Sequence, residues 1–259
     1  MDNQKELEEQ LLALFVFVMK YNSKFATSLV KYKVYKNELL NEINKIYKKY
    51  TKNGQLRINQ NDMNRELGNI KPLILKISKG LYEKEKTALP IILYLVFNKV
   101  YGKTYNILFK DSKDLKNISK EEIDMITTGF KINGKTNLQR IKDDKTIFNG
   151  KLKNDIKKSL KESKPIEDLK DNIESRFESE MKVAMRLTNN EIARVYNATA
   201  EVLYNQKGVK KVQWVSQLEG NTCGQCGELD GEIFDIEDAP IPIISTHVNC
   251  HCILVPADQ

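Results

Sequence analysis

The residues best suited to bind a metal ion are concentrated near the end of this chain. All four cysteines and both histidines of the 259 residues lie between positions 221 and 252, within NTCGQCGELDGEIF and STHVNCHC. Their order is Cys-x2-Cys, a spacer of 20 residues, then His-x2-Cys-x-Cys. Such a stretch can enclose a tetrahedral metal ion, be clamped by disulfides, or carry out thiol chemistry.

The first pair, Cys223 and Cys226, gives the firmest ligand prediction. A Cys-x2-Cys turn can present two sulfurs to one zinc ion. Gly224 and Gly227 are compatible with a tight, partly left-handed turn in which backbone N–H groups point at the sulfurs. Four ligands close a structural zinc site, so two more side chains are required.

The second pair comes from three candidates, His247, Cys250 and Cys252. His247 is preferred over His251, because His251 stands between two cysteines and would point to the opposite face of an extended strand. Cys250 and Cys252 share one face, and the sequence does not decide between them.

Three other interpretations of the cluster are weaker. A thioredoxin-like motif should begin a helix after a strand, whereas here the apparent hairpin ELDGEIF follows the cysteines. Disulfide pairing requires an oxidising setting such as an extracellular particle. A catalytic zinc keeps a position for water beside a general base, and although Glu228 and Asp230 are near, every polar ligand is needed for closure. A structural zinc site is therefore predicted.

Apolar periodicity predicts a helical chain up to about Gly208. Pro72 should kink a helix or start a new one, and residues 131–151 look least regular. Two helices follow, the second starting at a capping box formed by Thr188 and Glu191 and ending at Gly208.

A β-rich tail comes next, with a strand in VKKVQWVSQL, a hairpin at Asp230-Gly231 and a strand-like end in THVNCHCILV. The predicted fold class is mainly α with a small C-terminal β-rich, zinc-knuckle-like module. The predicted domains are a helical region 1–120, a basic helical body 121–208 and the β module 209–259.

Charge is unevenly distributed. Residues 209–259 hold two lysines and eight acidic residues and therefore carry a charge of −6. Since the whole chain has a net charge of +7, the preceding 208 residues carry +13. The densest basic stretch is 131–164, and a surface that contacts nucleic acid would lie there. The candidate contacts are Lys151, Lys153, Lys157, Lys158 and Lys161. The alternative is an ordinary solvated, lysine-rich surface.

Neither long apolar run predicts a membrane span. LLALFVFVM follows an acidic stretch rather than the basic start of a signal peptide, and ALPIILYLVF has about half the length needed to cross a bilayer. The expected compartment is a reducing cytoplasm, where clustered cysteines favour metal binding over disulfides.

The tail resembles the C-terminal domain of phage Mu F-like, or SPP1-type, minor head proteins. Their pattern is Thr-Cys-x2-Cys-x2-Leu-Asp-Gly, an aromatic residue, a proline loop and His-x2-Cys-x-Cys. The matching residues are Thr222, Cys223, Cys226, Leu229, Asp230, Gly231, Phe234, Pro242, His247, Asn249, Cys250 and Cys252. The resemblance covers about residues 130–256 and departs at His251, where the family usually has arginine, and at Gly220-Asn221. Residues 1–120 resemble no family that we can name.

The resemblance implies a non-enzymatic structural component of a tailed-phage virion. Such a protein sits at the portal vertex of the head, assists head morphogenesis and accompanies DNA during packaging or ejection. Its expected partners are the portal protein, a major capsid or scaffold protein and double-stranded DNA, and assembly takes place in the host cytoplasm. The alternatives are a zinc-supported nuclease or toxin-like enzyme, with His251 as the spare histidine, and a simple DNA-binding protein.

Overall fold

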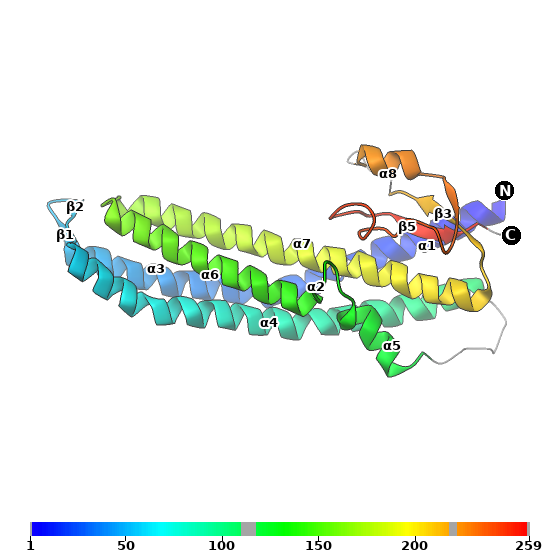
Figure 1. Cartoon of the computed structure of the whole chain (residues 1–259), viewed down its shortest axis with the longest axis horizontal. Helices are drawn as coiled ribbons and strands as arrows, with labels where there is room; N and C mark the ends of the chain where they lie inside the picture. Colours follow the sequence, from blue (N-terminus) through cyan, green and yellow to red (C-terminus); the bar gives the residue numbers. More distant parts are fainter. Residues whose placement is uncertain (1, 110–117, 218–221, 258–259) are drawn as a thin grey trace. The chain divides into compact units, whose positions relative to one another are not determined.

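The computed structural model describes residues 2–109, 118–217 and 222–257, and it is mainly α-helical (Figure 1). The helices in chain order are α1 (Asp2–Met19), α2 (Asn22–Ala26), the 3-10 turn η1 (Thr27–Leu29), α3 (Val30–Tyr50), α4 (Gln60–Leu108), α5 (Lys120–Asp124), the π-helical turn η2 (Met125–Gly129), α6 (Asn137–Lys161), α7 (Ile166–Lys207) and α8 (Gly224–Leu229). The strands are β1 (Thr51–Lys52), β2 (Gln55–Leu56), β3 (Lys211–Val215), β4 (Ile233–Asp235) and β5 (Ile253–Pro256). Over these ranges, no helix is long and apolar enough to cross a membrane.

The chain forms two compact units, and α4 and α7 each contribute to both. The bundle unit comprises Ala26–Ala88 and Leu138–Met185. The module unit comprises Met1–Phe25, Leu89–Asn137 and Arg186–Gln259. The predicted fold class is confirmed, and the division into three domains at residues 120 and 208 stays a prediction.

Three helix predictions, for residues 131–151, at Pro72 and at Thr188, differ in detail from the structure. Residues 137–161 form the regular helix α6, since Ile141, Phe148 and Leu152 recur at helical spacing and are buried. Helix α4 runs unbroken through Pro72, which lies on the exposed side, as does Gly68 four residues earlier. Water can therefore satisfy the Gly68 carbonyl that proline leaves without its usual N–H partner.

The predicted capping box at Thr188 is also wrong, because α7 continues through it as one helix of 42 residues. Glu191 is buried, and its carboxylate accepts hydrogen bonds from Arg194 at 2.9 Å and from Asn137 at 3.2 Å. Side-chain partners thus take the place of the backbone cap. The stop at Gly208 is confirmed: its φ is +78°, and the next N–H, of Val209, bonds back to the carbonyl of Tyr204.

The module unit contains a three-stranded antiparallel sheet in the order β4-β3-β5. The predicted strands in VKKVQWVSQL and at the end of THVNCHCILV correspond to β3 and β5, and Trp214 pairs with Leu254 across them. Trp214 is fully buried. Helix α1 packs against β5, and the Gln4 side chain donates a hydrogen bond to the Pro256 carbonyl at 3.0 Å. This sheet holds the cysteine-bearing segments on either side of β4.

The bundle unit consists of four helical segments, from α3, α4, α6 and α7, that lie side by side (Figure 1). Each contributes apolar side chains with almost no exposed surface, among them Leu39, Ile77, Leu152 and Phe177. Phe177 meets the rings of Phe148 and Tyr32 edge-on, at centroid separations of 5.1 and 6.4 Å. Apolar burial of this kind is the main source of stability in such a bundle.

A buried polar network interrupts this apolar core. The Lys145 ammonium lies 2.8 Å from Glu85, 2.6 Å from Glu180 and 2.9 Å from the Tyr32 hydroxyl. The Tyr32 hydroxyl in turn donates to Glu85 at 2.5 Å. Each of the four helical segments supplies one member of this network. Burial raises the pKa of both Glu85 and Glu180, because removal from water disfavours the charged carboxylate more than the nearby Lys145 ammonium stabilises it.

The network predicts that Lys145→Met destabilises the bundle far more than Glu180→Gln does. Removing the lysine leaves two buried carboxyl groups without a cation, at a cost of about 3 to 5 kcal/mol at neutral pH. Glu180→Gln leaves Lys145 paired with Glu85 and should cost about 1 kcal/mol or less. Urea denaturation followed by circular dichroism measures both values.

The penalty for Lys145→Met should shrink on acidification. The raised pKa values mean that the folded state holds protons that the unfolded chain has lost, so stability falls as pH rises above the ordinary carboxyl range. Below their raised pKa values the two carboxyl groups are protonated and need no cation, so the penalty should be smaller at about pH 4.5 than at pH 7. A Lys145→Met penalty that is equally large at low and neutral pH would contradict this account.

Candidate metal centre

The first cysteine pair lies at the start of a short helix rather than in a left-handed turn. Cys223 is the N-cap of α8, and the backbone N–H of Cys226 points at the Cys223 sulfur at 3.4 Å. Gly224 and Gly227 are helical and do not have positive φ, so that part of the prediction was wrong. The expected N–H to sulfur bond is nevertheless present.

The predicted hairpin at Asp230-Gly231 is instead a turn between a helix and a strand. Gly231 has φ +82°, and the Glu232 N–H bonds to the Leu229 carbonyl at 3.0 Å. The turn joins α8 to β4, which pairs with β3. The Cys-x2-Cys segment therefore does begin a helix after a strand, and the sequence argument that separated it from redox motifs does not hold.

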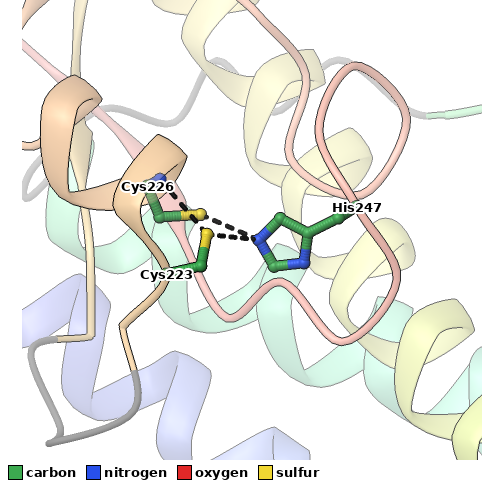
Figure 2. Close-up of side chains that lie close together, drawn as sticks. All are labelled: Cys223, Cys226 and His247. Atoms are coloured by element: carbon green, nitrogen blue, oxygen red, sulfur yellow. Dashed lines mark hydrogen bonds between the residues drawn. The ribbon is translucent and has the colours of Figure 1, made fainter.

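His247 brings the second segment to this pair. Figure 2 shows its imidazole pointing at both sulfurs, with Nε2 3.0 Å from Cys223 Sγ and 3.1 Å from Cys226 Sγ. The other nitrogen, Nδ1, lies 2.9 Å from the Val248 carbonyl oxygen, which can only accept. The proton of a neutral imidazole therefore belongs on Nδ1, and the Nε2 lone pair faces the sulfurs. Metal-binding histidines are held in this tautomer in the same way.

Cys226 also belongs to a second group, with Cys250 and Cys252. The ligand atoms within each of the two groups lie within 4.8 Å of one another. The Cys226 and Cys250 sulfurs are 3.7 Å apart, and all three thiols of this group are buried. The structure thus brings together all five predicted metal ligands, with Cys226 common to both groups.

Hydrogen bonds within the cluster divide the thiols into two kinds. The N–H of Cys226 lowers the pKa of Cys223, and the thiol of Cys252 lowers the pKa of Cys250 to about 5. Burial raises the pKa of Cys226 to about 12, and the hydrogen bond to Cys250 raises the pKa of Cys252. The cluster cannot hold all its sulfurs as thiolates, because their charges repel one another. A bound cation would remove that repulsion.

The chemistry of the donors suits a tetrahedral metal ion, and the ligand atoms form two overlapping groups that share Cys226. Bonds of 2.0 to 2.3 Å at tetrahedral angles place ligand atoms about 3.5 to 3.8 Å apart. The separation of the Cys226 and Cys250 sulfurs matches this spacing, and the two His247 separations are a few tenths of an ångström shorter. Thiolates and imidazole are the ligands that zinc and other soft divalent ions prefer. The cluster can therefore bind a metal ion.

Ser216 connects the cluster to the sheet. Its hydroxyl donates to the Cys226 carbonyl at 2.8 Å and receives the indole N–H of Trp214 at 3.2 Å. The Cys252 thiol lies 3.5 Å from the same hydroxyl, and the Ser216 N–H donates to Asp230 at 2.7 Å. The sequence gave no sign of this role, since Ser216 belongs to no recognisable metal motif.

A row of polar side chains on α7 holds the second segment. Asn190, Asn197 and Tyr204 follow at intervals of seven residues, so they share one side of the helix. The N–H of Asn249 donates to Asn190 at 2.8 Å, and the Tyr204 hydroxyl donates to the Leu254 carbonyl at 2.9 Å.

Asn197 makes two contacts with the same segment. Its amide donates to the Cys252 carbonyl at 3.2 Å and accepts from the Leu254 N–H at 3.2 Å. Asn197 is buried, and so are Asn190 and Tyr204. Polar residues recurring every seven positions on the buried side of a helix are the signal that could have revealed this row.

The remaining candidates lie outside the cluster. His251 belongs to neither group of ligands, is exposed, and has its ring 6.2 Å from that of Phe15. The predicted nucleic-acid contacts all lie on α6 in the bundle unit, where Lys153 is half-buried and the other four are exposed, namely Lys151, Lys157, Lys158 and Lys161.

Comparison with known families supports the resemblance seen in the sequence. Residues 150–255 match the model of a family described as phage Mu protein F like protein. This part of the chain is similar to the Mu F-like family. The matched range includes every residue of the cluster and the α7 row.

The chain is also similar to an uncharacterized protein of Haemophilus influenzae, to which it is 23% identical over 140 residues. The aligned segment is 52% of this chain and 29% of the relative, so this chain spans well under two thirds of the length of that protein. No solved structure matches the chain.

We predict that Cys250 is a ligand of this centre and that Cys252 is not, because Cys250 is the thiol whose pKa is lowered and its sulfur lies 3.7 Å from that of Cys226. Cys250→Ser should abolish stoichiometric metal binding, because it removes one of the four bonds to the ion. Cys252→Ser should keep one ion per chain and weaken affinity about 10- to 100-fold, because it removes only a group that orients a ligand. Elemental analysis of reduced protein after gel filtration, followed by chelator competition, measures both. The reverse pattern would show that Cys252 is the ligand.

Proposed function

We propose that this protein is a structural minor head protein of a tailed bacteriophage, associated with the portal vertex and assisting head assembly and DNA packaging or ejection. The observation that carries the proposal is the Mu F-like match over residues 150–255. The matched region retains the complete Cys-x2-Cys and His-x2-Cys-x-Cys pattern, and the structure folds that pattern into one cluster. The proposed location is the virion, with assembly in the host cytoplasm.

The proposed cofactor is one structural zinc ion bound by Cys223, Cys226, His247 and Cys250. Three sulfurs and one imidazole nitrogen form a common structural zinc set, and four protein ligands leave no position for a reactive water. Such an ion would tie α8 to the segment before β5. Cys252 would then orient its neighbour Cys250 through a hydrogen bond.

The proposed partners are the portal protein, a major capsid or scaffold protein, and double-stranded DNA. Exposed lysines on α6 support DNA contact, because the phosphate backbone attracts exposed cationic side chains. Four of these lysines are Lys151, Lys157, Lys158 and Lys161. The acidic module 209–259 is the less favourable surface for DNA.

The proposal includes no enzymatic role. A nuclease would use the spare histidine, His251, beside the metal. The His251 ring instead lies edge-on to Phe15 and is in neither group of ligands. Metal-dependent DNA cleavage that is lost in His251→Ala would overturn the structural role.

The direct test is quantitative mass spectrometry of purified virions of the phage that encodes this chain. A minor head protein should be present at a small, fixed number of copies relative to the major capsid protein, and empty heads purified without DNA should retain it. Host proteins of similar abundance in the lysate serve as the control for contamination. If the chain is abundant in infected cells but absent from virions and heads, the proposal is wrong.

A further inference from the structure

A second candidate site lies in the bundle unit, in a cleft between α4 and α6. The cleft has a volume of about 430 Å³, within the range of sites for small ligands. Its lining residues are Leu75, Ser78, Lys79, Tyr82, Lys142, Lys145, Thr146, Asn149 and Lys153. Four of them are lysines and none is acidic.

At the base of the cleft Ser78 is 9% exposed, and its hydroxyl has no hydrogen-bond partner. A buried hydroxyl without a partner is costly, so an unpaired one that lines a cleft indicates a ligand atom that is missing. Asn149 beside it is also buried, and its amide group makes only a long contact, 3.5 Å, with the Ile74 carbonyl. Both groups can donate hydrogen bonds to an anion.

The rim supplies positive charge that the protein does not neutralise. Lys79 and Lys142 are exposed and Lys153 is half-buried. Across residues 2–109, 118–217 and 222–257, no carboxylate forms an ion pair with any of the three.

Lys145 differs from these three, because its ammonium already has three partners. Glu85, Glu180 and Tyr32 occupy its donors within the core. The groups free to meet a ligand are therefore the Ser78 hydroxyl and the three rim ammoniums.

We propose that this cleft binds the phosphate group of a nucleotide, either free or within a DNA strand. The three ammoniums would surround the phosphate oxygens, and Ser78 would donate to one of them. Leu75 and Tyr82 give the cleft an apolar wall against which the sugar or base can pack. The site is distinct from the metal cluster, and the proposed role in phage heads does not depend on it.

The proposal separates two sets of lysines on one helix. Lys142 and Lys153 are eleven residues apart, about three turns, so they share the side of α6 that faces the cleft. Lys151 and Lys158 are seven residues apart and lie on another side, outside the cleft. The two pairs carry the same charge, which makes the second a matched control for the first.

The test is calorimetric titration of the full chain with thymidine monophosphate in a low-salt buffer free of phosphate. Lys142→Met/Lys153→Met should weaken binding at least about tenfold, because two charge-assisted hydrogen bonds are lost. Ser78→Ala should weaken it about three- to tenfold without a change in charge, and its fold should be unaffected since the lost hydroxyl was unpaired. Lys151→Met/Lys158→Met, which removes the same charge outside the cleft, should weaken binding less than Lys142→Met/Lys153→Met does.

Two results would overturn the proposal. One is the absence of saturable binding to the unaltered chain at about 10 mM nucleotide, a concentration above the Kd of even a weak site. The other is an equal loss of nucleotide affinity in Lys142→Met/Lys153→Met and in Lys151→Met/Lys158→Met, which would indicate general charge attraction. A parallel titration with a short DNA duplex identifies the source of the phosphate. Loss of duplex affinity in Lys142→Met/Lys153→Met, with competition by the nucleotide, assigns DNA; an unchanged duplex affinity assigns free nucleotide.

Discussion

The module unit depends on the close approach of sulfur and imidazole groups from two segments of the chain. The sheet is small, and its outer strand β4 has only three residues, none of which is buried. The Cys226 sulfur lies 3.1 Å from His247 and 3.7 Å from Cys250, and these contacts join α8 to the segment before β5. Several thiolates at such distances repel one another unless a cation lies between them. A bound metal ion would therefore remove the repulsion between the thiolates and would join α8 to the segment before β5.

The cluster would still be loosely held without helix α7. Asn190, Asn197 and Tyr204 give the backbone of residues 249–254 hydrogen bonds that a short edge strand lacks. Because these donors and acceptors project from a long regular helix, they fix the height and direction of the segment that carries Cys250. The segment of residues 249–254 is thus held on α7 by directed polar contacts as well as by apolar packing.

The sequence predicted the parts of this structure that follow from short-range patterns. Cysteine spacing identified the cluster, alternation identified β3, and Gly208 identified the end of α7. At Thr188 the local capping signal was outweighed by the burial of Glu191. At Pro72 the helix continues because the affected backbone faces water. The α7 row was missed for another reason: Asn197 bonds to residues more than 50 positions away, and nothing near it in the chain reveals those partners.

The lysines of α6 and the cysteine cluster belong to different units of the chain. The core of the bundle unit already contains two carboxylates on one lysine, and its surface carries the lysines of α6. The cysteine-bearing tail is acidic. The basic surface of α6 is therefore more favourable for an anionic partner than the acidic tail is.

The central claim is that one zinc ion closes the cluster with three sulfurs and one nitrogen. Zinc-edge X-ray absorption of the full chain, purified under reducing conditions, measures this directly. The account predicts about three sulfur ligands near 2.3 Å and one nitrogen near 2.0 Å, with no bound water. A shell of four sulfurs, a shell dominated by oxygen and nitrogen, or protein that retains no zinc would contradict it.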